Sequence, residues 1–115
     1  MSIHKEYLGP ILVLSFDEYE ELRDPAEFAD LLQREISDGR LYLLIDMKDV
    51  IYLSSAILGS IITSLKVLRE KEGHIKLVNV QPCVSNVLEM TRVVRVVEIY
   101  NDKETALRSF NVLFS

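Results

Sequence analysis

Several residue types that often stabilise or functionalise small proteins are scarce in this chain. Its 115 residues include one cysteine, three prolines, four glycines and no tryptophan. Because Cys83 is alone, an internal disulfide is excluded, and the separated His4 and His74 add no cluster with metal-ligand spacing. Cys83 follows Pro82 at an expected helix start, which can lower a thiol pKa, but we interpret it as a small buried residue. We expect no metal and no cofactor.

Membrane segments and long basic runs are also missing. No apolar run approaches the roughly 20 residues of a membrane-spanning helix, and the first residues lack the apolar stretch of a signal peptide. Eighteen acidic residues against 13 basic ones give a net charge of −5, which argues against binding nucleic acid or an anionic membrane. These absences predict a cytoplasmic location with no nucleic-acid or membrane partner.

The apolar content, in contrast, is typical of a folded protein. Hydrophobic residues make up 49 % of the chain, and we expect residues 1–115 to form one domain. Strands are expected over residues 3–7, 11–16, 41–46, 75–80 and 96–99, and helices over about 25–38, 55–71, from 82 onward and after 101. This order predicts an α/β fold with a mixed, mostly parallel sheet of four or five strands, packed with about four helices.

Two of the expected helices carry capping residues. Asp24 suits the N-cap of the first helix, with Glu27 three residues later, and Gly39 suits the left-handed position after its end. Asn101 and Glu104 have the spacing of a capping box for the last helix. The pattern therefore predicts where both helices begin.

The rest of the chain is organised around residues 43–59. An apolar run over 41–45 is typical of a strand covered on both faces, and polar residues at 46–49 interrupt it. From Ser55 the period becomes helical, with an apolar arc of Ile57, Leu58, Ile61, Ile62, Leu65 and Leu68. The opposite side carries Ser55, Gly59, Ser60, Thr63, Ser64 and Lys66. Ser55 is therefore expected at a helix N-terminus, beside a small and polar face.

This stretch resembles the signature of the STAS domain, the module of bacterial anti-sigma factor antagonists. Residues 44–50 match a strand motif that reads roughly L-D-L-S-x-V, and residues 53–59 match the following D-S-[SAT]-G-L-G segment with two departures. Ser54 stands where the family has aspartate, and Ile57 stands where it has glycine. Ser55 matches the serine that the family's cognate kinase phosphorylates.

The resemblance implies an anti-sigma factor antagonist, also called an anti-anti-sigma factor. Such a protein binds an anti-sigma factor that is also an ATP-dependent serine kinase, and so controls sigma-factor-dependent transcription. It is a substrate of that kinase and not itself an enzyme. The implied partner surface consists of Ser54, Ser55, Ala56, Gly59, Ser60 and Thr63.

The residues of this motif also have plainer interpretations. Ser55 is either the phosphoacceptor or only a helix cap, and Ser54 is the better cap candidate and the less favoured phosphoacceptor. Ile57 is either a core contact or a sign of an altered partner, and Gly59 is either a tolerated helix glycine or a flat landing place for a partner. The acidic stretch 17–21 is interpreted as a solvated loop.

Two other functions remain open at this point. One is a STAS scaffold without a phospho-switch, in which the apolar tail over Val112, Leu113 and Phe114 supports a weak homodimer. The other is a STAS module that binds a small anion or nucleotide at the helix N-terminus. The second is less favoured because no phosphate-cradling glycine loop precedes the helix.

Overall fold

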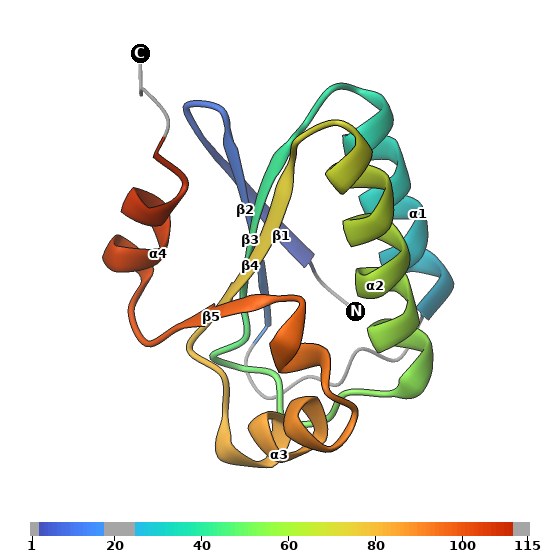
Figure 1. The fold of residues 1–115 in the computed structure, drawn as a ribbon, viewed down its shortest axis with the longest axis vertical. Coiled ribbons are helices and arrows are strands. Elements are labelled where there is room, and N and C mark those ends of the chain that lie inside the picture. The colour runs from blue at the N-terminus through green and yellow to red at the C-terminus, as the bar shows by residue number, and fades with distance from the viewer. Residues whose placement is uncertain (1–2, 18–24, 112–115) are drawn as a thin grey trace.

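The computed structural model describes residues 3–17 and 25–111 and confirms the expected α/β architecture (Figure 1). A five-stranded sheet is packed with four α-helices and one short 3-10 helix in the described part of the chain. In chain order the elements are β1 Ile3–Leu8, β2 Ile11–Phe16, α1 Pro25–Ser37, β3 Tyr42–Asp46, α2 Ser55–Glu70, β4 His74–Val78, α3 Pro82–Met90, η1 Val93–Arg95, β5 Glu98–Tyr100 and α4 Lys103–Ser109. Asp24, most of the acidic stretch and the apolar tail lie outside the described residues.

The strands lie in the sheet in the order in which they occur in the chain, β1-β2-β3-β4-β5. β1 and β2 form an antiparallel hairpin with Leu8 opposite Ile11, and Gly9 takes a φ of 57° in its turn. All later neighbours are parallel, so each needs a crossover, and α1, α2 and α3 lie in these crossovers. β1 and β5 are therefore the two edge strands.

The sheet separates two apolar layers. Its larger layer packs against α1 and α2, and α4 covers the opposite face (Figure 1). β2 and β3 read as continuous apolar runs because alternate side chains enter different layers. Leu12, Leu14, Leu43 and Ile45 belong to the larger layer, and Ile11, Val13, Leu44, Ala106 and Phe110 belong to the smaller one.

The end of α2 is packed closely against the sheet. Glu72 takes the left-handed φ of 59° after the helix, and the adjacent Gly73 lies against the chain before β3. A Cβ added at Gly73 would lie 2.5 Å from the carbonyl oxygen of Leu41 and 2.8 Å from Cδ2 of Leu68. Gly73 is thus required by a close backbone approach rather than by its φ.

Three local predictions need correction or adjustment. The last helix is capped by Asp102 and not by Asn101, because the Asp102 carboxylate accepts a hydrogen bond from Thr105 N at 2.8 Å. Hydrogen bonds from the backbone N–H and hydroxyl of Thr105 also lower the pKa of Asp102. β5 begins at Glu98, two residues later than expected, because Val97 N still donates to Val93 O at 3.0 Å in the turn of η1. Similarly, β4 ends at Val78 and not at residue 80.

Candidate functional site

The loop between β3 and α2 is held in place at its start by Asp46. This last residue of β3 accepts hydrogen bonds through Oδ1 from Lys48 N at 3.0 Å and from Asn79 Nδ2 at 3.3 Å. Met47 N donates to Val78 O at 2.9 Å, which continues the contact between β3 and β4 beyond the strands. The ends of two neighbouring strands therefore set the position of this loop.

Residues at the start of α3 hold the rest of the loop. Gln81 Nε2 donates to Lys48 O at 2.5 Å, and Cys83 Sγ donates to Ile51 O at 3.2 Å. Cys83 is exposed, so the interpretation of this residue as buried was wrong. Its side chain reaches a loop carbonyl on the surface instead of entering the core, because the first turn of α3 lies beside the loop.

Ser54 is the N-cap of α2. Its backbone is extended, with φ −77° and ψ 161°, and its half-buried Oγ accepts a hydrogen bond from Ile57 N at 3.2 Å. Ser55 is the first residue of the helix and is exposed, and its hydroxyl forms no hydrogen bond with any described residue. The capping alternative for Ser55 is therefore excluded, and its oxygen is available to solvent.

Ile57 is a core residue. Its side chain is fully buried and belongs to the layer between the sheet and helices α1 and α2. The core-contact interpretation is confirmed. A glycine at this position would leave that volume empty, so the departure from the family motif has a packing reason in this chain.

Four of the predicted partner-binding residues lie together along a groove between α1 and α2. Ala56, Gly59, Ser60 and Thr63 line it, and its volume is about 530 Å³. Across the groove, α1 contributes Ala29, Gln33, Ile36 and Ser37. Ser54 and Ser55 do not line the groove but precede these residues at the N-terminal end of α2. Ser64, which was expected on the small polar face of α2, is buried and also lines the groove.

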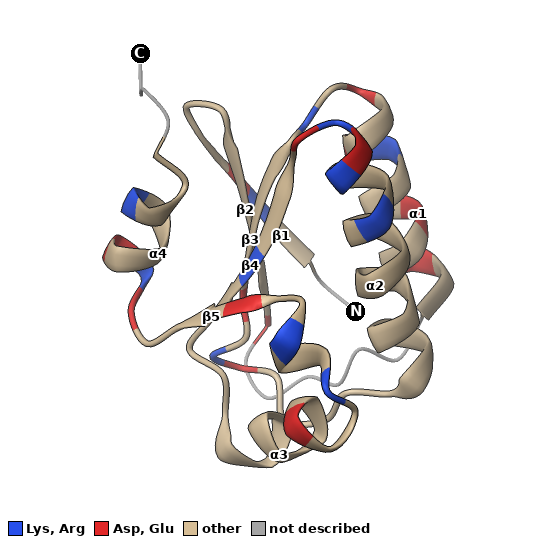
Figure 2. Cartoon of the chain, viewed as in Figure 1, with Lys and Arg blue, Asp and Glu red and all other residues tan. Residues whose placement is uncertain are grey.

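The start of α2 carries no charged side chains. Its first turn contains no acidic residue, and no charged residue occurs in the helix before Lys66, as the tan first half of α2 in Figure 2 shows. The backbone N–H groups of a first helical turn have no intrahelical acceptors, and they form the positive end of the helix dipole. The exposed Ser55 hydroxyl thus lies where added negative charge is favoured.

Two exposed apolar residues beside this site were missed by sequence reasoning. Ile51 and Tyr52, in the loop before Ser54, are 46 % and 55 % exposed. The signal was available, because large apolar residues in a polar connecting segment have no strand or helix period that would bury them. Of the acidic stretch, Asp17 lies in the described part and pairs with His4.

The described residues give no indication of a metal centre or a membrane span. None of their His, Cys, Asp and Glu side chains form a group of three that could hold a metal ion. No helix in the same part of the chain is long and apolar enough to cross a bilayer.

Comparison with known proteins places this geometry in a family. The family model of the STAS domain matches residues 7–106. The structure of TM1081 from Thermotoga maritima, a candidate anti-sigma factor antagonist, is 22 % identical and has a TM-score of 0.88, covering 96 % of this chain and 95 % of that one.

More distant structures share the same fold. The anti-sigma factor antagonist SpoIIAA is 13 % identical in its unphosphorylated form, with a TM-score of 0.75 over 97 % of this chain and 100 % of that one. Its phosphorylated form, described as a Bacillus cell fate determinant, is 14 % identical, with a TM-score of 0.72 over 94 % and 99 %. The murine anion transporter Solute Carrier 26 family member A9 matches at 13 % identity and a TM-score of 0.73, covering 92 % of this chain but 18 % of its own.

At these identities the structural likeness establishes the fold alone. A search of curated protein sequences gave no significant match.

Proposed function

This chain belongs to the STAS domain family, and from that premise we propose that it is an anti-sigma factor antagonist controlled by phosphorylation of Ser55. Its partner in this proposal is an anti-sigma factor with serine kinase activity. The main support for the proposal is that the two neighbouring serines have different roles. Ser54 caps α2, and the neighbouring Ser55 leaves its hydroxyl exposed and unbonded to any described residue.

A phosphate on Ser55 is compatible with the folded domain. It would lie at a helix N-terminus, where the dipole and the free N–H groups favour negative charge by about 0.3–1 kcal/mol at an exposed site. The side chain points to solvent, so no buried group has to move to accommodate it. Phosphorylation should therefore change what binds to this end of α2 without unfolding the protein.

The surrounding surface suits a protein partner. The exposed Ile51 and Tyr52 lie on one side of Ser55 in the chain, and the uncharged groove residues from Ala56 to Thr63 lie on the other. The centres of protein interfaces are depleted in charge and enriched in aromatic residues such as tyrosine. A phosphate would add about −1.5 to −2 charge at this place, on a chain that already carries −5.

The consequence for binding follows from solvation. A partner that packs against this uncharged surface would have to strip water from the phosphate, which is unfavourable unless the partner supplies compensating donors. Phosphorylation of Ser55 is thus expected to weaken the complex. The existence of unphosphorylated and phosphorylated SpoIIAA structures supports such a switch in this fold.

Neither departure from the family motif removes a feature that this proposal needs. Ser54 in place of aspartate keeps the capping oxygen. Ile57 in place of glycine points into the core, away from the partner surface. Both changes leave the Ser55 hydroxyl exposed.

The proposal is tested by capture from a native bacterial lysate. Wild type, Ser55→Ala and Ser55→Glu are immobilised in parallel with Asn101→Glu, which adds the same charge at an exposed site beside α4. We expect wild type, Ser55→Ala and Asn101→Glu to retain an ATP-binding serine kinase and Ser55→Glu to lose it. Mass spectrometry after incubation with ATP and the captured kinase should locate the phosphate on Ser55 and not on Ser54.

Other results would count against the proposal in different ways. Capture of the same kinase by wild type and Ser55→Glu would mean that Ser55 does not control binding. Phosphate on Ser54 would mean that Ser54, and not Ser55, is the phosphorylated residue. Absence of any kinase from the wild-type capture would contradict the proposed partner.

A further inference from the structure

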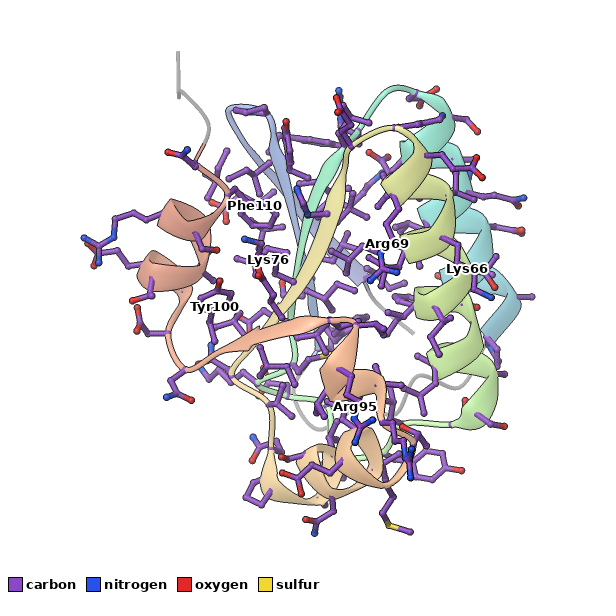
Figure 3. The ribbon with its side chains drawn as sticks, viewed as in Figure 1. Lys66, Arg69, Lys76, Arg95, Tyr100 and Phe110 are labelled. Carbon is purple, nitrogen blue, oxygen red and sulfur yellow. The ribbon has the colours of Figure 1, made fainter. Side chains whose placement is uncertain are left out.

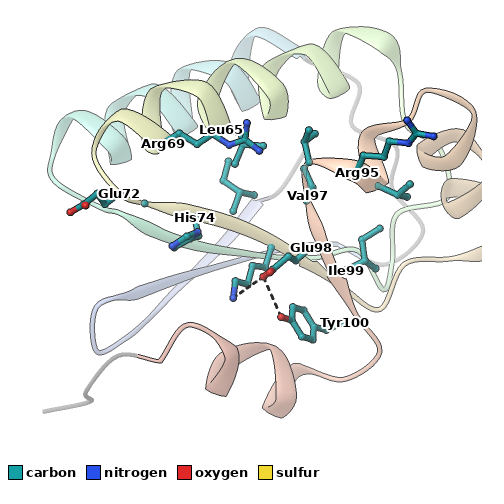
Figure 4. A pocket seen from close by; sticks show the side chains of 14 residues that line it. Leu65, Arg69, Glu72, His74, Arg95, Val97, Glu98, Ile99 and Tyr100 are labelled. Carbon is teal, nitrogen blue, oxygen red and sulfur yellow. Dashed lines mark hydrogen bonds and ion pairs between the residues drawn. The ribbon is translucent and has the colours of Figure 1, made fainter.

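A second groove lies at the other end of α2, away from Ser55. It has a volume of about 730 Å³ and is formed by the C-terminal half of α2, the start of β4 and the chain from η1 through β5 (Figure 4). Arg69, which lines it, is 14 residues after Ser55, and a helix rises about 1.5 Å per residue, so roughly 21 Å of helix separate the two. The groove is therefore independent of the proposed partner surface.

The groove exists because β5 is short and starts late. β5 pairs with β4 from Lys76 onward, so the preceding His74 and Ile75 have no strand partner on that side among the described residues. The chain before β5 turns away from β4, and Val97 enters the core between the sheet and α2. The gap is lined by aliphatic side chains, namely Leu65, Ile75, Val94, Val96, Val97 and Ile99.

Two arginines border this apolar surface. Arg69 comes from α2 and Arg95 from η1, and in both Figure 3 and Figure 4 they lie on opposite sides of the start of β5. Both are exposed, and neither guanidinium forms an ion pair or side-chain hydrogen bond with a described residue. Arg40 and Arg108, in contrast, each pair with a glutamate.

The acidic residues of the groove do not neutralise these arginines. Glu98 is held by Lys76 Nζ at 2.9 Å and accepts a hydrogen bond from Tyr100 OH at 3.2 Å, and the contact with Lys76 lowers the pKa of this carboxyl. With Glu72 as the other acid, the lining carries three positive and two negative charges, or +1 with His74 neutral. This groove is thus locally positive on a chain whose net charge is −5.

Lys76 itself is already fully engaged. Besides Glu98, its Nζ donates to the carbonyl oxygen and the hydroxyl of Ser109 at 3.0 and 2.8 Å, and it lies 4.6 Å from the ring centre of Phe110. It attaches α4 to the sheet, as its position between Tyr100 and Phe110 in Figure 3 indicates. The positively charged side chains of the groove that remain available to an anion are therefore those of Arg69 and Arg95.

We propose that this groove binds an elongated organic dianion with an apolar middle, such as an aliphatic dicarboxylate. Guanidinium groups pair with carboxylates through two parallel N–H···O bonds, which places one acidic end at each arginine. The aliphatic lining between the arginines receives the hydrocarbon part. A volume of about 730 Å³ lies within the range of small-molecule sites.

The proposal is tested with three probes of equal chain length. Nitrogen-labelled protein is titrated with nonanedioate, with nonanoate and with nonane carrying a hydroxyl at both ends, and amide NMR shifts are followed. We expect nonanedioate to shift the signals of residues 74–76 and 94–100 most strongly, nonanoate less and the neutral diol least. Inorganic phosphate serves as a simple-anion probe and should have little effect.

Arginine variants and a matched control complete the test. Arg69→Gln and Arg95→Gln should each weaken nonanedioate binding about threefold to tenfold, toward the affinity of nonanoate. Lys66→Gln removes the same charge from an exposed position of α2 that does not line the groove, and it should leave binding unchanged. All three side chains are exposed, so circular dichroism should show unaltered folding.

Four results would overturn the proposal. The first is no shift in these segments with nonanedioate, and the second is equal binding of the diol. The third is saturation by inorganic phosphate alone, which would indicate a general anion site without a role for the apolar lining. The fourth is a loss of affinity in Lys66→Gln equal to that in Arg69→Gln, which would indicate long-range charge attraction.

Discussion

Replacing Gly59 by alanine is expected to stabilise this protein. Gly59 lies in the second turn of α2 and is exposed, and a Cβ added there would have no atom within 4 Å apart from its chain neighbours and the backbone of its own helix. Glycine within a helix is less stable than alanine by about 0.5–1 kcal/mol, because it loses more backbone freedom on folding. With no new contact to add or subtract, the free energy of unfolding should rise by about this amount, and the melting temperature by about 2–6 °C.

The same substitution at Gly73 provides the matched control. Here the new Cβ would lie 2.5 Å from Leu41 O and 2.8 Å from Leu68 Cδ2. Leu41 O accepts a hydrogen bond from His74 N at 2.8 Å, so displacing this carbonyl disturbs the first contact between β3 and β4. Overpacking of this kind destabilises proteins by about 1–3 kcal/mol. The two alanine variants should therefore shift stability in opposite directions.

Urea unfolding followed by far-UV circular dichroism measures both variants of this pair. A loss of stability in Gly59→Ala would refute the argument that alanine is favoured over glycine within α2. Equal shifts in the two variants would refute the argument that Gly73 is required by its close approach to Leu41. Partner capture gives a second readout, because Gly59 lines the groove between α1 and α2. If that groove contacts the partner, Gly59→Ala should be more stable than wild type and yet bind more weakly.

Three further outcomes can be measured by urea unfolding. Ser54→Ala should lower the free energy of unfolding by about 0.5–2 kcal/mol because α2 loses its cap, whereas Ser55→Ala should change it by less than about 0.5 kcal/mol; equal effects would contradict the cap assignment. Ile57→Gly, which restores the family residue, should lower it by about 3–6 kcal/mol because a fully buried side chain is removed from a helix, and unchanged stability would place Ile57 outside the core. The Lys76 contact lowers the pKa of Glu98 below its ordinary value of 4.5, so the stability from this carboxylate is present above 4.5 and is lost as the pH falls through its lower folded pKa. Glu98→Gln should therefore make stability fall less between about pH 5 and pH 3, by a small amount because the carboxylate is largely exposed, and an unchanged slope would contradict the shift.

Much of the fold was predictable because it follows from local periodicity. The continuous apolar strands β2 and β3 indicated a sheet covered on both faces, and the alternation of strands and helices indicated parallel pairing. The apolar arc of α2 correctly predicted that Ile57 faces the core. The ends of the elements were less predictable. The start of β5, for example, depends on the hydrogen bond from Val97 N to Val93 O in the turn of η1.

The candidate site was predicted in part for the same reason. The helical period placed Gly59, Ser60 and Thr63 on one face, and these residues line one groove. The helical period of α2 contains no information about the position of α1, which forms the other wall of that groove. Neighbouring helices are set by packing over long sequence distances, which a local pattern does not contain.

The amino-acid sequence alone indicates the order of the elements, the buried strands and the two serines at the start of α2. The tertiary structure decided which serine caps the helix, because capping depends on the extended backbone at Ser54 and on the position of Ile57 N. It also decided that Cys83 contacts a loop carbonyl and that Arg69 and Arg95 border one groove. These features join segments that are distant in the chain, so they depend on how the sheet brings its crossovers together.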